Sequence, residues 1–369
     1  MPKHSKPNIR EVAARAGVSP ATASRALNGN TAVDAELAQR VFAAARSLGY
    51  QVGRAAERRQ SITLILPGIR DTYYSHTATG VIDAAKREGY LVNVMLSDSD
   101  PDQELECLIR ACDPNTAGII IAPITDRDPR SASPALRHTP IVVTGPRFIA
   151  EGLIHVHLDN NEAAYLCTRY LLRLGRKNIA LFIHYWAEHI HNYEDFMKKY
   201  QSSNHGCFTA HDRYEGYCRA LKEAGLEPNP SLLAFGGFSY ESGYSCARQL
   251  LASGIDFDAV IVPNDRCGAG ILNSLQEQGF NVPGQVSLVC LDSDLIAKVM
   301  SPRLTSISSV DYEVGQHCAK QLFHLIKGEP AHDVEIGAKL QIKNSTQHIS
   351  YNTAVSVAGS APTGDHPRL

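Results

Sequence analysis

Basic side chains are concentrated in the first sixty residues of the sequence. This segment holds ten Lys and Arg against four Asp and Glu, a balance of +6. The whole chain of 369 residues carries −2, so the remainder carries −8. A basic segment joined to an acidic body is the electrostatic pattern of a protein that binds phosphate groups. We therefore expect residues 1–60 to bind nucleic acid.

Residues 8–28 have the pattern of two short helices joined by a tight turn. Apolar residues recur with helical spacing in the first helix, at Ile9, Val12, Ala13 and Ala16. Asn8 and Glu11 have the spacing of a capping box, which predicts that the helix starts there. Gly17 follows where the chain must reverse, because glycine adopts a positive φ without steric cost.

The second helix is expected to begin at Pro20, where a missing N–H costs nothing, with Ser19 as its cap. Its small residues, Ala23, Ala26 and Leu27, face the first helix, and the solvent side carries Ala21, Thr22 and Arg25. A third helix, capped by Asp34, closes the core with Leu37, Val41, Ala45 and Leu48. This is the pattern of a helix-turn-helix, whose second helix enters the DNA major groove. A plain αα-hairpin is the alternative, and the charge asymmetry argues against it.

The same residues resemble the headpiece of the lactose-repressor (LacI/GalR) family of bacterial regulators. The pattern V-A-x-x-A-G-V-S-x-x-T-x-S-R-x-L-N extends from Val12 to Asn28, and A-R-S-L-G-Y follows at residues 45–50. The resemblance implies that Pro20, Ala21 and Arg25 read bases. Arg25 is suited to paired hydrogen bonds with guanine O6 and N7, whereas the other two offer apolar contact to a thymine methyl. The implied phosphate contacts are Ser19, Thr22, Ser24 and Asn28.

The linker, residues 51–61, departs from the family pattern. Family members carry Pro-Asn here, followed by a hinge helix whose leucine enters the minor groove at the dimer axis. In this sequence Val52 and Gly53 replace Pro-Asn, and Arg59 falls near the leucine position, next to Arg58. An arginine can enter a narrow A·T-rich minor groove by charge, but it cannot unstack bases as an apolar wedge does. We therefore do not extend the leucine-wedge mechanism of the family to this linker.

From residue 61 onward, short apolar strands alternate with amphipathic helices. Strands are expected at 62–66, 91–96, 118–122, 141–144, 179–183, 232–235, 259–262 and 286–291, and helices at 79–88, 103–111, 162–174, 193–200, 214–225, 242–253 and 268–279. Continuous apolar strands of this kind predict parallel, doubly wound sheets. The fold class is therefore α/β: a three-helix headpiece at 1–50, followed after the linker by a two-lobed, parallel-sheet effector domain at 62–346 with a ligand cleft.

This body also resembles the family and, through it, the periplasmic sugar-binding proteins. The matching segments are 158–163, 174–180, 213–217, 262–265, 282–283, Asp292 and 304–307, within a resemblance that extends from about residue 8 to 346. It implies that the chain returns to the first lobe after Asp292 and then crosses back once more. The effector-binding residues implied by position are Tyr73, Tyr74, Arg213, Asn264, Asp265 and Asp292.

Each implied effector residue has a chemical role and an alternative. Arg213 would donate two hydrogen bonds to ligand hydroxyls or a carboxylate, and Asp292 would accept from ligand hydroxyls. The two tyrosines would stack on a sugar or a base, or else serve packing. In the alternative to effector binding, Asp265 caps the following helix and Arg213 pairs with Glu215. Cys290 replaces a usual glycine ahead of Asp292, which predicts a displaced loop.

The segment between 184 and 212 includes about twenty residues without a family counterpart and contains five histidines. His189 and His191 have a spacing that could bind a transition metal, but an inserted helix at the cleft mouth is favoured. The nine cysteines lack metal-ligand spacing and are expected to be buried thiols, so neither a metal nor a cofactor is expected. The tail, 347–369, is rich in Ser, Pro, Thr and Gly and is expected to be disordered.

These features predict a sequence-specific transcription regulator, specifically a repressor, that binds a pseudo-palindromic operator in double-stranded DNA as a homodimer. A small-molecule effector, a sugar or a related metabolite, would control it. The alternative is a solute-binding protein of a transport system. An enzyme is disfavoured because the catalytic and phosphate-loop motifs are missing. Without a secretory signal or an apolar run of about 18 residues, we expect a cytoplasmic protein that does not enter the membrane.

Overall fold

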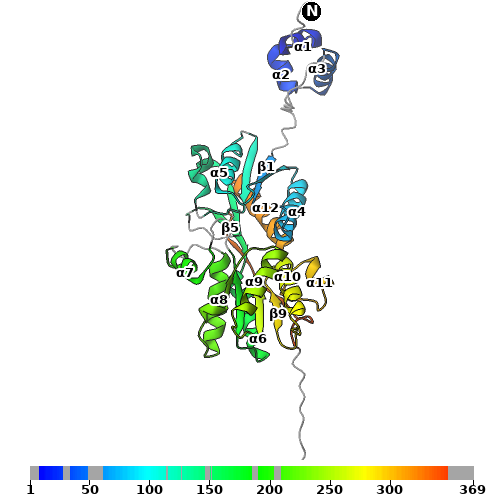
Figure 1. Ribbon diagram of the computed structural model, residues 1–369. Helices are drawn as coiled ribbons and strands as arrows, with labels where there is room; N and C mark the ends of the chain where they lie inside the picture. The colour runs from blue at the N-terminus through cyan, green and yellow to red at the C-terminus, as the bar shows by residue number, and fades with distance from the viewer. Residues whose placement is uncertain are drawn as a thin grey trace, which may run out of the picture. The chain divides into compact units, whose positions relative to one another are not determined.

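The computed structural model describes residues 8–27, 34–48, 61–113, 115–125, 127–145, 150, 152–184, 190–202 and 209–347 (Figure 1). Several predictions fall outside these residues. They concern Asn28, the linker with Arg58 and Arg59, the histidine pair through His189, and the tail from residue 348 onward.

The headpiece consists of the three predicted helices, α1 (Ile9–Ala16), α2 (Pro20–Leu27) and α3 (Ala35–Leu48). The side-chain oxygen of Asn8 accepts hydrogen bonds from the N–H groups of Arg10 and Glu11, and its amide donates to the Glu11 carboxylate. The predicted cap is therefore confirmed. The core is built from small and branched side chains, namely Val12, Ala13, Ala16, Ala23, Ala26, Leu27, Val41, Ala44 and Ala45.

The rest of the chain contributes to two compact units. The first includes the segment up to Thr144, Ala150–His155 and Asp311–Asp333, and the second includes Gly145–Ile149, Val156–Val310 and Val334 onward. The prediction that the chain returns to the first lobe after Asp292 and then leaves it again is confirmed by the assignment of Asp311–Asp333.

The first sheet has the strand order β11-β5-β4-β3-β1-β2. Its strands are β1 (Ser61–Leu66), β2 (Leu91–Leu96), β3 (Thr116–Ile121), β4 (Ile141–Thr144), β5 (Ile154–Leu158) and β11 (Val334–Ile336). The paired strands whose register is resolved are parallel. The helices of unit 1 are α4 (Thr72–Arg87), α5 (Pro101–Arg110) and α12 (Asp311–Lys327).

Helices cover both faces of this sheet. The connections from β1 to β2 and from β2 to β3 run in opposite directions across the sheet, so right-handed crossovers place α4 and α5 on opposite faces. Figure 1 shows α5 on one side of β1, with α4 and α12 together on the other. Short 3₁₀ turns at Pro129–Ser131 and Pro134–His138 precede β4.

The second sheet has the order β12-β10-β9-β8-β6-β7. Its strands are β6 (Ile179–Ile183), β7 (Leu233–Phe235), β8 (Ala259–Val262), β9 (Ser287–Cys290), β10 (Thr305–Ile307) and β12 (Leu340–Gln341); only β12 pairs antiparallel. The helices of unit 2 are α6 (Asn160–Arg173), α7 (Tyr193–Ser202), α8 (Thr209–Glu223), α9 (Tyr240–Ala252), α10 (Asp265–Glu277) and α11 (Leu295–Val299), with a 3₁₀ turn at Pro230–Leu232.

Alternate residues of these strands enter two separate cores. Ile179, Leu181 and Ile183 of β6 pack with α6 and α8, whereas Ala180 and Phe182 pack with α9 and α10. Burial on both faces explains why the strands read as continuous apolar runs in the sequence.

Two helix starts differ from the prediction by five residues or more. Helix α4 begins at Thr72, because Asp71 accepts a hydrogen bond from the Tyr73 N–H, and not at residue 79. Helix α8 begins at Thr209 and therefore contains Arg213, which was expected just ahead of it. The structure also adds elements that the sequence did not predict: β5, β10, β11, β12, α11 and α12.

Candidate DNA-binding and effector sites

The exposed face of α2 carries the residues expected to read bases. Pro20, Ala21 and Arg25 are exposed. The Ser19 hydroxyl accepts the Thr22 N–H at 3.0 Å and lies 2.8 Å from the Thr22 hydroxyl, so Ser19 caps the helix as predicted. The cap fixes where the first turn of α2 begins, and the first turn is the part that a helix-turn-helix presents to base edges.

The turn between α1 and α2 is held by a basic residue from α3. Gly17 has φ +69°, the left-handed conformation that its place at the end of α1 requires. The Arg40 guanidinium donates to the Ala16 carbonyl at 2.8 Å, which satisfies a carbonyl at the end of α1. Arg40 therefore orients α3 against the turn, and part of the +6 charge serves the fold as well as phosphate binding.

Thr22 and Ser24, the other expected phosphate contacts on α2, are half-buried. They lie on the same helix as Arg25, one on each side of Ala23, which is buried in the core. The structure thus brings five of the seven expected DNA contacts onto α2, with Ser19 as its cap. Asn28 lies just beyond the described residues.

Arg213 of unit 2 is positioned by the start of α6. Its Nε donates to Oδ1 of Asn160 at 3.0 Å, and Asn160 directly follows β5 and the α6 cap Asp159. Helices α6 and α8 pack backbone to backbone, because a Cβ on Gly216 would overlap the Asn161 carbonyl. The Glu215 carboxylate accepts from Tyr200 at 3.1 Å. The Arg213 guanidinium is therefore held at the carboxyl end of β5.

The ends of β6, β7 and β8 contribute a second group of side chains. His184 follows β6, and its Nδ1 lies 2.6 Å from the Gly236 carbonyl after β7. Its ring meets Phe238 edge to face, with ring centroids 3.9 Å apart. Asn264 follows β8 and donates to the Phe238 carbonyl at 3.1 Å. These groups lie along one edge of the sheet, where open α/β sheets bind ligands.

Asn264 and Asp265 both have structural contacts. Asn264, not Asp265, caps α10, since its side-chain oxygen accepts the Cys267 N–H at 2.9 Å. Asp265 is buried, and its carboxylate accepts the N–H groups of Asp294 and Ala297 at 2.9 and 3.1 Å. Asp265 therefore anchors the start of α11.

Asp292 is half-buried just after β9. The buried Cys290 thiol donates to the Asp292 carbonyl at 2.6 Å, so the cysteine that replaces the usual glycine fixes this loop. Burial raises the pKa of the Cys290 thiol well above its usual range, and the neighbouring Asp265 carboxylate adds to this shift. The thiol is therefore a neutral hydrogen-bond donor here.

Tyr73 and Tyr74 belong to unit 1, in the first turn of α4. Their rings meet edge to face at 5.0 Å; Tyr74 is buried and Tyr73 half-buried. In the same unit, the buried Glu104 of α5 anchors residues 124–125, because its carboxylate accepts from the Ile124 N–H and the Thr125 hydroxyl. Unit 1 thus holds its two expected tyrosines on a helix and not on a loop.

The sequence prediction missed three residues of unit 2 as parts of this site. Asn160 falls within a matching segment and His184 is one histidine of the insertion, but the sequence pattern assigns neither of them to the effector site. Phe238 had no prediction. The available signal was its position after Gly236 and Gly237 at the end of an apolar strand, where parallel sheets bring side chains to a common edge.

The insertion forms the predicted helix α7, which packs on α8. Phe196 is fully buried and contacts His211, Tyr214 and Phe235 with ring centroids 5.1 to 6.0 Å apart. Among the residues that the structure describes, no cluster of three or more His, Cys, Asp or Glu side chains is suited to a metal ion. The cysteines in these ranges are free thiols.

Two family models match the chain. Residues 8–52 match the LacI family of bacterial regulatory proteins, and residues 59–351 match periplasmic binding proteins and the sugar-binding domain of the LacI family. The chain belongs to the LacI family. It is therefore a DNA-binding transcription regulator with an effector-binding domain, and not an enzyme. No helix in the described ranges is long and apolar enough to span a membrane.

Relatives within the LacI family match over nearly the whole chain. The HTH-type transcriptional repressor CytR of Escherichia coli (strain K12) is 30% identical over 335 residues, covering 87% of this chain and 90% of the relative. Catabolite control protein A of Priestia megaterium is 26% identical over 346 residues, covering 92% and 99%. The lac repressor dimer bound to operator and the anti-inducer ONPF shares the fold, with a TM-score of 0.74 at 22% identity over 93% of this chain and all of that chain.

Proposed function

We propose that this regulator is a repressor that binds a pseudo-palindromic operator as a homodimer in the cytoplasm. The observation that carries the proposal is the Ser19-capped helix α2, which exposes Pro20, Ala21 and Arg25 on a basic three-helix unit. A two-fold dimer would present two such helices to two half-sites. The relatives support this assignment, because CytR is a repressor and the lac repressor dimer binds an operator.

The proposed domains are a headpiece at 1–50, a linker at 51–61 and an effector domain at 62–346. In the linker, Arg58 and Arg59 would contact the minor groove by charge. The Ser19, Thr22, Ser24 and Asn28 side chains would bind backbone phosphates, which fix the register of α2 on the duplex.

The proposed effector is a sugar or a sugar derivative bound at the edge of the unit 2 sheet. Arg213, held by Asn160, and Asp292 supply opposite charges, which together suit a ligand with several hydroxyls. Phe238 offers an aromatic face next to Asn264. Tyr73 and Tyr74 are proposed to contribute from unit 1. Structural relatives are described as bound to cellobiose and to ribose, which supports this ligand class.

The proposed dimer interface uses apolar side chains that the units leave in water. In unit 1 these are Ile82 of α4 and Leu91 and Val94 of β2, each at least 42% exposed. In unit 2 they are Leu295 and Val299 of α11, which are 63% and 70% exposed. Burial of such side chains favours association.

Selection from a randomised duplex pool tests the DNA-binding proposal. The full-length protein should enrich a two-fold symmetric sequence, and Arg25→Ala should weaken binding to it by about 1–3 kcal/mol while relaxing the preference at one base pair of each half-site. Arg110→Ala, an exposed change on α5, serves as the charge-matched control. Equal sequence preference in Arg25→Ala and the wild type would show that Arg25 does not read a base.

A further inference from the structure

Helices α4 and α12 of unit 1 pack very closely over part of their length. A Cβ on Gly80 would overlap the Tyr312 carbonyl, and a Cβ on Gly315 would overlap the Thr77 carbonyl. The Tyr312 hydroxyl also donates to the Asp83 carboxylate at 2.9 Å. The two backbones therefore meet directly around Gly80 and Gly315.

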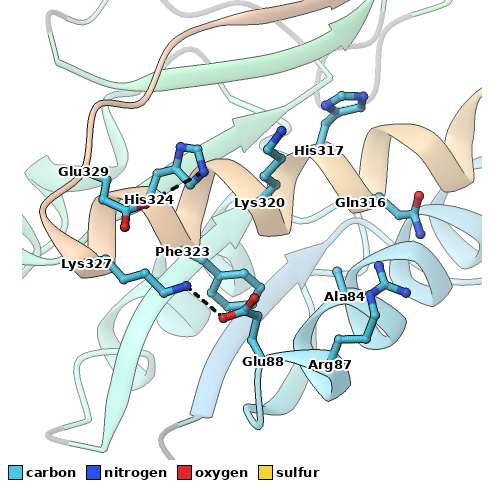
Figure 2. Close-up of a pocket in the computed structure, with 10 residues that line it drawn as sticks. All are labelled: Ala84, Arg87, Glu88, Gln316, His317, Lys320, Phe323, His324, Lys327 and Glu329. Atoms are coloured by element: carbon cyan, nitrogen blue, oxygen red, sulfur yellow. Dashed lines mark hydrogen bonds and ion pairs between the residues drawn. The ribbon is translucent and has the colours of Figure 1, made fainter.

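Beyond this close approach, a cavity of about 420 Å³ opens toward the carboxyl ends of the two helices (Figure 2). Its lining comes from α4, α12 and the turn that follows each helix, and all of these residues belong to unit 1. The cavity is thus separate from the proposed effector residues of unit 2, and its size falls in the range of small-molecule sites.

The floor of this cavity is apolar. Phe323 is buried and stacks on Tyr90, with ring centroids 5.0 Å apart and planes 25° apart. Ala84 is buried beside it. An aromatic floor that is already packed from beneath gives a ligand a preformed surface.

The rim of the cavity carries an excess of cationic groups. Lys327 donates to the Glu88 carboxylate at 2.9 Å, and His324 lies 4.0 Å from Glu329, so both acids of the rim have a basic neighbour. Within the described ranges, no carboxylate lies within 4.0 Å of the Arg87 or Lys320 nitrogens. Arg87 and Lys320 can therefore meet a ligand, and the Lys and Arg side chains of the rim outnumber its carboxylates on a body that is acidic overall.

We propose that the α4–α12 cavity binds a small phosphorylated metabolite as a second regulatory ligand. Arg87 and Lys320 bind the phosphate, because a guanidinium forks onto two oxygens and an ammonium adds a point charge. Gln316 of α12 also lines the cavity and hydrogen-bonds to a hydroxyl, while the Phe323 ring supports the carbon skeleton.

Helix α12 gives such a ligand a route to the rest of the protein. The chain passes from unit 2 into unit 1 at Asp311, the first residue of α12, and returns to unit 2 after Asp333. A ligand that contacts α12 therefore acts on a segment of unit 1 whose two ends both connect to unit 2. Differential affinity for two arrangements of this segment would couple the cavity to DNA binding.

Calorimetry on the full-length protein without DNA tests the site, with ribose 5-phosphate as the probe and ribose as its uncharged counterpart. The wild type should bind ribose 5-phosphate with a dissociation constant on the order of 1 mM or tighter. Arg87→Gln and Lys320→Gln should each weaken binding by about tenfold or more, since each removes a charged hydrogen-bond donor. Arg110→Gln, the matched change on α5, should bind as the wild type does.

Three results would overturn the proposal. They are absence of binding by the wild type, equal affinity for ribose, and full affinity in both cavity variants. Circular dichroism of each variant establishes that it is folded, and the assay does not depend on operator recognition.

Discussion

Two histidines of unit 2 are held neutral by burial. Burial lowers the pKa of His184 to about 4, an effect that the Arg213 charge reinforces and the hydrogen bond with the Gly236 carbonyl opposes. Burial also lowers the pKa of His211 to about 4, with a smaller contribution from Lys199. At neutral pH the His184 ring is therefore a neutral partner for a ligand, next to the permanent charge of Arg213.

The free energy of unfolding should fall as the pH falls from about 6.5 toward about 4. In this window the unfolded chain binds protons that the buried imidazoles do not, so acid favours unfolding. His211→Phe, which keeps a ring against Phe196 and Tyr200, should reduce this pH dependence. Urea unfolding at several pH values measures it, with the exposed His138→Phe as control. The same slope in His211→Phe and the wild type would contradict the assignment.

The sequence located the charged effector candidates better than the aromatic one. Arg213 and Asp292 stand out because the family resemblance marks their positions and each side chain carries a charge. Phe238 does not, since an aromatic residue near a strand has the same sequence pattern whether it packs in a core or faces a ligand. Asp265 is an effector candidate in the sequence, yet its carboxylate has structural contacts. It accepts two backbone hydrogen bonds from residues about thirty positions away. Such long-range partners cannot be read from local spacing.

At the scale of elements, the sequence predicted those whose ends are set by local chemistry. Helices α1 and α2 follow from Asn8, Gly17 and Ser19, and β1 to β4 follow from apolar runs. Helix α12 was missed although it has 17 residues. Gly315 interrupts its apolar pattern, and glycine ordinarily disfavours a helix interior. The tertiary contact that requires this glycine lies on α4, more than two hundred residues away.

Gly315→Ala tests that contact. Alanine is the better helix former, by about 1 kcal/mol, so an isolated α12 would gain stability. In the protein, however, the added Cβ would overlap the Thr77 carbonyl, so we expect a net loss of about 1–3 kcal/mol. Chemical denaturation measures the difference, and Glu313→Ala on the exposed side of α12 should have little effect. A more stable Gly315→Ala protein would mean that the helices separate without cost.

The whole molecule joins a basic headpiece to two units that share one sheet plan. When the strands of each sheet are ranked by their position in the chain, the two sheets have the same order from edge to edge. In each sheet the last strand in the chain, β11 or β12, lies at one edge. His184, Phe238, Asn264 and Asp292 lie at the carboxyl ends of strands of the second sheet, and Asn160 follows β5 of the first sheet. A ligand there acts on the headpiece only through the connected chain, which makes regulation a property of the full protein.

Asp292→Ala should separate the two activities. Operator affinity should stay near that of the wild type, while the response to the effector, typically about 1–3 kcal/mol of coupling, should be lost. Thermal-shift screening of sugars, nucleosides and small acids identifies the effector, and operator titrations with and without it give the coupling. Asp102→Ala on α5 is the matched control. An unchanged response in Asp292→Ala would remove this residue from the site.

Strand β2 has a further consequence. It ends its sheet, pairing only with β1, and its burial pattern leaves Leu91 and Val94 in water. An edge of this kind offers a row of unmatched amides and carbonyls to any extended peptide, so in a lone subunit it is a hazard for misassembly. The proposed homodimer would shield that edge. Dilution below the dimer dissociation constant would then raise the risk of aggregation and also release the protein from the operator.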